Sequence, residues 1–124
     1  MSRAMRTLMA AQTLLFAAAS LLHRGVLADG YEHPAAATAE GIIALVLAVG
    51  LVLTWVVDRA RLVALATQGF ALVGTAIGVF LVLSGVGPST PLDIGLHLLM
   101  VALLVVGLAV TWVGNANAPG RAEA

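Results

Sequence analysis

Five side chains of this 124-residue chain could together bind a ligand or a metal ion. They are His23, His33, Glu40, Asp93 and His97. Imidazole nitrogens and carboxylate oxygens suit zinc, iron or copper(II), and the favoured metal set is His23, Glu40 and His97. The chain has no cysteine, which excludes thiolate metal sites, disulfides and cysteine nucleophiles. No tight ligand spacing joins the five candidates, so only the fold can bring them together.

Glu40 and His97 are the candidates that structural roles explain least well. Each lies a little more than one turn into a predicted helix, roughly 8 Å from its start. A carboxylate inside a bilayer costs about 2.5–3.5 kcal/mol on insertion scales for the comparable aspartate. A neighbouring histidine would offset part of that cost by pairing, and we expect His97 to be that partner. The sequence thus predicts a buried Glu40–His97 site with His23 as a third member.

The remaining candidates have structural interpretations beside the functional one. Thr90 and Asp93 fit the N-cap and third position of a helix, with a proline at the first position. His33 precedes a proline and fits another N-cap, and His23 is equally compatible with the headgroup region of a bilayer. These interpretations stay open at the level of sequence.

Two glutamines interrupt otherwise apolar stretches. Gln12 and Gln68 are 56 residues apart, and polar side chains in a membrane span almost always face the interior of the bundle. An interhelical hydrogen bond between such groups contributes about 1 kcal/mol. We predict that they hold helices together without a further role.

The elements that must position these residues are four apolar stretches. They are predicted to be membrane-spanning helices over residues 5–28, 35–57, 62–83 and 92–113. The chain is 61% hydrophobic and 10% charged, whereas a soluble domain carries about 25% charged residues, and a spanning helix needs about 20 apolar residues. The prediction is one all-α domain over residues 1–124, a four-transmembrane-helix bundle in a lipid bilayer. Six basic residues balance six acidic ones, so nothing indicates a nucleic-acid partner.

Arginine placement predicts the orientation. With four spans the two termini share a side, and that side holds Arg3, Arg6, Arg59, Arg61 and Arg121, against Arg24 alone on the other. Positive residues favour the cytoplasmic side. We therefore predict a multi-pass protein of a bacterial inner membrane with both termini inside and the His/Glu group in the outer leaflet.

An internal repeat is also predicted. Residues 50–56 (GLVLTWV) match residues 107–113 (GLAVTWV) at an offset of 57, and the same register places Glu40 opposite His97. This pattern predicts two related helical hairpins. Chance similarity between apolar segments is the alternative.

The junction before the fourth stretch carries a short motif. Gly85, Gly87, Pro88, Thr90, Asp93 and His97 form a GxGPxTxxDxxxH pattern. This pattern resembles the third-to-fourth helix junction of small four-span bacterial inner-membrane proteins, and His23 and the segment 39–41 are also similar to that group. The group has no assigned activity, so the resemblance implies which residues matter and not what they do.

Several functions fit these features. The favoured one is binding of a metal or another ligand, with proton coupling as a variant; the cofactor would be a divalent metal, or a haem held by His23 and His97. A small transporter working as a homo-oligomer, with Glu40 and His97 as a proton relay, is the second. A non-catalytic accessory or assembly subunit of a larger membrane complex is the third. An enzyme acting on a lipid or a quinone is less favoured, because no nucleophile–base arrangement is visible.

Overall fold

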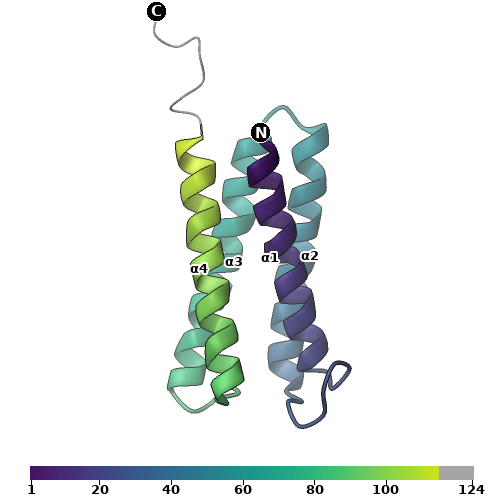
Figure 1. Ribbon diagram of the computed structural model, residues 1–124, viewed down its shortest axis with the longest axis vertical. Helices are drawn as coiled ribbons and strands as arrows, with labels where there is room; N and C mark the ends of the chain where they lie inside the picture. Colours follow the sequence, from purple (N-terminus) through teal and green to yellow (C-terminus); the bar gives the residue numbers. More distant parts are fainter. Residues whose placement is uncertain (115–124) are drawn as a thin grey trace, which may run out of the picture.

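The computed structural model describes residues 1–114, which fold into four helices (Figure 1). The helices are α1 (Arg3–Leu22), α2 (Pro34–Val56), α3 (Ala60–Leu83) and α4 (Pro91–Val113). Each is long and apolar enough to cross a membrane, and no strand occurs in this part of the chain. The predicted all-α four-helix bundle is therefore confirmed.

The first helix ends earlier than predicted. Gly25 has a φ of 73°, in the left-handed region that glycine adopts without strain. The backbone N–H of Val26 donates to the carbonyl of Leu21 at 3.0 Å, which closes the helix end. The apolar residues up to position 28 therefore belong to the following loop, and His23 is the C-cap of α1 rather than an interior residue.

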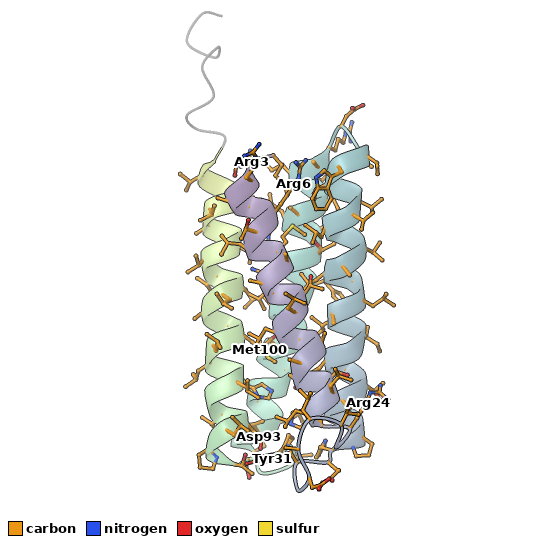
Figure 2. All side chains as sticks on the ribbon, turned by 45° about the vertical axis from the view of Figure 1, so that its right-hand side comes forward. Arg3, Arg6, Arg24, Tyr31, Asp93 and Met100 are labelled. Atoms are coloured by element: carbon orange, nitrogen blue, oxygen red, sulfur yellow. The ribbon has the colours of Figure 1, made fainter. Side chains whose placement is uncertain are left out.

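The helices run up and down around a closed bundle. Consecutive helices pack against each other, and α1 also packs against α4. The α1–α2 loop (residues 23–33) and the α3–α4 loop (residues 84–90) lie at one end, here named the loop end (Figure 1). The N-terminus and the α2–α3 turn lie at the opposite end, here named the arginine end. Figure 2 shows Arg3 and Arg6 there, far from Arg24, Tyr31 and Asp93.

A pair of glutamines crosses the middle of the bundle between α1 and α3. Gln12 Nε2 donates to Gln68 Oε1 at 3.0 Å and to the carbonyl of Leu103 at 2.9 Å. Gln68 Nε2 donates to Thr111 Oγ1 at 3.1 Å, so the pair also contacts α4. Both side chains are at most 1% exposed. The predicted interhelical hydrogen bond is present, beside a core of large apolar side chains such as Phe16.

At the arginine end, α1 and α2 are joined by one side chain. Arg6 donates from Nε to Thr54 Oγ1 at 3.2 Å and from Nη2 to the Thr54 carbonyl at 2.8 Å. Its guanidinium also lies over the Trp55 ring, 4.9 Å from the ring centroid. Planar guanidinium groups suit such combined hydrogen bonding and stacking.

The second hairpin repeats this arrangement. Arg61 donates from Nε to the Thr111 carbonyl at 3.0 Å and from Nη2 to the Trp112 carbonyl. Its guanidinium lies 5.6 Å from the centroid of the Trp112 ring. The Thr-Trp sequence shared by α2 and α4 thus receives an arginine from the preceding helix in both hairpins. This is a structural counterpart of the repeat seen in the sequence.

Candidate functional site

A buried imidazole joins three helices at the loop end. His23 Nδ1 lies 2.7 Å from Glu40 Oε2 of α2, and its Nε2 lies 2.9 Å from Asp93 Oδ1 of α4. His23 and Asp93 are each 1% exposed and Glu40 is 5% exposed. The sequence placed all three residues near this end, and the structure brings them into one hydrogen-bonded cluster, here named the His23 cluster.

Asp93 has a capping role as well as its place in the His23 cluster. Its Oδ2 accepts from the Thr90 backbone N–H at 2.9 Å and from the Thr90 hydroxyl at 2.5 Å. The Thr90 hydroxyl in turn accepts from the Asp93 N–H, which completes a capping box at the start of α4. The capping prediction is confirmed. Its contact with His23 was not predicted, because a capping motif carries no information about a distant helix.

The protonation of His23 follows from its two partners. A carboxylate only accepts hydrogen bonds, so an imidazole that contacts one at each nitrogen is best matched as the doubly protonated cation. Burial disfavours that charge, but the hydrogen bonds to Glu40 and Asp93 and their negative charge outweigh it and raise the pKa of His23. The ring is therefore held by two charge-assisted hydrogen bonds.

His97 lies next to the His23 cluster without hydrogen bonding to Glu40. Its Nδ1 lies 2.8 Å from the backbone carbonyl of Asp93, one turn earlier on α4. A carbonyl only accepts, so Nδ1 carries the proton and Nε2 presents its lone pair in the neutral ring. The sequence predicted His97 as the partner of Glu40; in the structure that hydrogen-bonding partner is His23.

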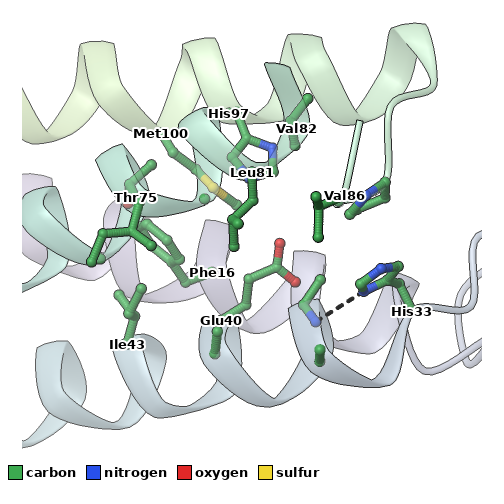
Figure 3. A pocket seen from close by; sticks show the side chains of 18 residues that line it. Phe16, His33, Glu40, Ile43, Thr75, Leu81, Val82, Val86, His97 and Met100 are labelled. Carbon is green, nitrogen blue, oxygen red and sulfur yellow. Dashed lines mark hydrogen bonds between the residues drawn. The ribbon is translucent and has the colours of Figure 1, made fainter. Parts of the chain in front are cut away.

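Glu40 and His97 instead share a cavity of about 200 Å³ between α2 and α3 (Figure 3). Small residues create the space, among them Ala39 of α2 and Gly78 of α3. A Cβ placed on Gly78 would lie 3.1 Å from His97 Nε2, so this glycine keeps the ring nitrogen accessible. The remaining wall is almost entirely apolar, and the loop residue Val86 lies at its loop end.

His33 lies at the edge of this cavity. Its Nδ1 accepts from the backbone N–H of Ala36 at 3.2 Å, drawn as a dashed line in Figure 3, and it is the N-cap of α2. The N-cap interpretation is confirmed. The His33 side chain makes no hydrogen bond to the His23 cluster, although its backbone N–H donates to the His23 carbonyl at 2.9 Å.

The metal prediction gains no support from this geometry. Among residues 1–114 no group of three or more histidine, aspartate or glutamate side chains is arranged to hold a metal ion. Both ring nitrogens of His23 are engaged by carboxylates, so His23 offers no lone pair to a metal or to a haem iron. The residues present do not fit the bis-histidine haem that His23 and His97 were expected to hold.

Comparisons with protein-family models, with curated proteins and with solved structures found no match to this chain.

Proposed function

We propose that this protein binds a small amphipathic molecule in the cavity between α2 and α3. The ligand has an apolar body and a polar head that donates hydrogen bonds to Glu40 and His97. The proposal rests on two hydrogen-bond acceptors without a partner among the described residues, on side chains that line an otherwise apolar cavity. Glu40 uses Oε2 for His23 and His97 uses Nδ1 for Asp93. Neither Glu40 Oε1 nor His97 Nε2 has a hydrogen-bond partner within residues 1–114, and both side chains line the cavity.

The size and position of the cavity favour a membrane-soluble ligand. A cavity of about 150 Å³ can bind benzene in other proteins, and this one measures about 200 Å³. Its lining residues Ala39, Ile77 and Leu81 are exposed on the surfaces of α2 and α3 that would face lipid. A molecule dissolved in the bilayer could therefore enter sideways and leave an alkyl tail among the lipids.

Arginine placement supports an outer-leaflet site. Arg3, Arg6, Arg59 and Arg61 lie at the arginine end, and Arg24 lies at the loop end; Arg121 is outside the described residues. We assign the arginine end to the cytoplasm by the positive-inside rule, which puts both termini inside and the cavity in the outer leaflet. The resemblance of the Gly85–His97 junction to small bacterial four-span proteins favours a bacterial inner membrane.

The test uses 1-octanol and n-octylamine as probes with protein reconstituted in lipid nanodiscs. Nitrogen-15 labelling of histidine side chains gives a signal at His97 that unspecific partitioning into lipid does not mimic. We expect a saturable shift of the His97 Nε2 signal in the wild type with at least one probe. A Gly78→Val variant should abolish it by filling the cavity. Gly69→Val is the matched control, because a Cβ on this α3 glycine meets nothing within 4 Å. If neither probe causes a saturable shift that depends on Gly78, the proposal is wrong.

A further inference from the structure

The His23 cluster has a net charge that can be counted from its hydrogen bonds. Two hydrogen bonds join His23 to Glu40 and Asp93, and each needs one proton. When Glu40 Oε1 carries no proton, the ring with both N–H groups is +1 and the two carboxylates are −2, so the cluster has a net charge of −1. Moving one of these two protons onto a carboxylate leaves that sum unchanged. His97 adds no charge in its neutral form, with the proton on Nδ1 and the lone pair on Nε2.

The other charged groups near Glu40 do not cancel this charge. α3 contributes no titratable side chain at the loop end, since its only one, Arg61, lies at the arginine end. His33 borders the cavity from the loop and is neutral when Nδ1 accepts its hydrogen bond. Arg24 is exposed at the end of α1 and does not line the cavity; its guanidinium approaches Gly41 on the side of α2 that faces Ser20 of α1. No arginine of residues 1–114 lines the cavity, so no cationic side chain pairs with the negative charge of the His23 cluster there.

In the cavity, the two side-chain atoms of Glu40 and His97 that have no hydrogen-bond partner among residues 1–114 are of the same kind. Oε1 of an ionised Glu40 and Nε2 of a neutral His97 are both acceptors, and neither can donate. A ligand with two or more donors and one positive charge complements both the atoms and the net charge. An anionic ligand would be repelled, and a bare metal ion would lack the ligands it needs in this apolar wall.

Resting on the proposed ligand site, we infer that its ligand is a protonated primary amine with an apolar tail. The ammonium group donates one N–H to Glu40 Oε1 and another to His97 Nε2, and the tail lies along the apolar wall toward the lipid. The charge of the amine neutralises that of the His23 cluster. Protons compete with the amine, because protonation of Glu40 or His97 removes an acceptor and the attraction together.

The experiment compares four eight-carbon probes by the His97 Nε2 signal in nanodiscs at neutral pH. They are n-octylamine, 1-octanol, octanoate and trimethyloctylammonium. Alkylamines are protonated at this pH, as the lysine side chain is. We expect octylamine to bind about tenfold or more tightly than octanol, as one charge-assisted hydrogen bond permits. Octanoate should not bind, and trimethyloctylammonium, which has the charge but no N–H, should bind more weakly than octylamine.

A Glu40→Gln variant tests the charge directly. The amide oxygen can still accept from His23, while the negative charge is removed. Octylamine affinity should fall by about tenfold or more, and octanol affinity should fall by less, because octanol carries no charge. If this variant does not fold, the four-probe comparison on the wild type still decides the question. The wild-type affinity for octylamine should also fall as the pH is lowered.

The outcomes separate this inference from the proposed function. If octanol binds as tightly as octylamine, the ligand site stands and the amine inference is wrong. Equal binding of octylamine and trimethyloctylammonium would overturn the role of the N–H donors. If no probe produces a saturable shift, both the site and its ligand class are wrong.

Discussion

His23 Nδ1 lies 2.7 Å from Glu40 Oε2 and thereby fixes the rotation of the carboxylate that borders the cavity. The imidazole holds one carboxylate oxygen of Glu40. The other oxygen has no hydrogen-bond partner among residues 1–114, and the Glu40 side chain lines the cavity. Asp93 holds the opposite side of the ring at 2.9 Å. His23 is consequently a positioning residue whose own atoms do not face the cavity, and its removal should affect both stability and ligand binding.

We expect His23→Ala to destabilise the protein by about 3–5 kcal/mol, because it leaves two buried carboxylates without their cation. Unfolding in mixed micelles with increasing denaturing detergent measures the change. Arg24→Ala is the control: this neighbouring side chain is exposed, so its loss should change stability by less than about 0.5 kcal/mol. Equal stability of the two variants would contradict the role assigned to the His23 cluster.

Stability should depend on pH through His23. Its pKa in the folded protein is raised from the ordinary value of 6.5. A raised folded pKa means that the stabilisation is fully present below pH 6.5 and is lost as the pH rises through the folded value. Unfolding free energies measured from pH 6 to about pH 9 should therefore decrease in the wild type. In His23→Gln the same series should be flatter, and parallel curves would argue against His23 as the titrating group.

The glutamine pair should be sensitive to the small residue beside it. A Cβ on Gly107 would overlap Gln68 Oε1 and Gln12 Nε2, so Gly107→Ala should cost about 1–3 kcal/mol through overpacking. Gly95→Ala on the same helix is the control, since a Cβ there meets nothing within 4 Å. The Gly95→Ala control should leave the free energy of unfolding unchanged or raise it slightly, because alanine is a better helix former than glycine. If Gly107→Ala leaves the stability unchanged, the glutamine pair tolerates displacement and the prediction is wrong.

The two arginine contacts at the arginine end should be of similar strength. Arg6→Lys and Arg61→Lys each remove a hydrogen bond and weaken stacking on Trp55 or Trp112, at an expected cost of about 1 kcal/mol each. The two sites lie in different hairpins, so the double variant should lose the sum of the single losses. Tryptophan emission recorded during unfolding reports both sites, and a large difference between them would argue against equivalent hairpins.

Structural features that depend on residues close together in the sequence were predictable. Hydrophobic length placed all four helices, and the Thr90–Asp93 spacing indicated the capping box that the structure contains. The predicted end of α1 was wrong. Apolar residues follow Gly25, so the hydropathy of the sequence stays high beyond the turn that ends the helix. The signal that would have found the end was the glycine itself, two residues after His23.

The pairing within the site could not be predicted in the same way. Helices in a membrane are apolar on all sides, so hydrophobic periodicity does not tell which face of one meets which face of the next. Glu40 and His97 were predicted to lie near the same end of the bundle, and both line the cavity there. The choice of His23 as the partner of Glu40, and the contact between His23 and Asp93, depend on the rotation of α1 against α2 and α4.

The repeated arginine contacts have a consequence for the opposite end of the bundle. The register that aligns Trp55 with Trp112 also aligns Glu40 with His97, and these two residues border one cavity. Two separate copies of a single hairpin would have to present the same side chain at both positions. A chain that contains both hairpins is free of that symmetry and can set an acid on one wall and a base on another. Covalent linkage of two unequal hairpins thus allows a carboxylate and an imidazole to line the same cavity.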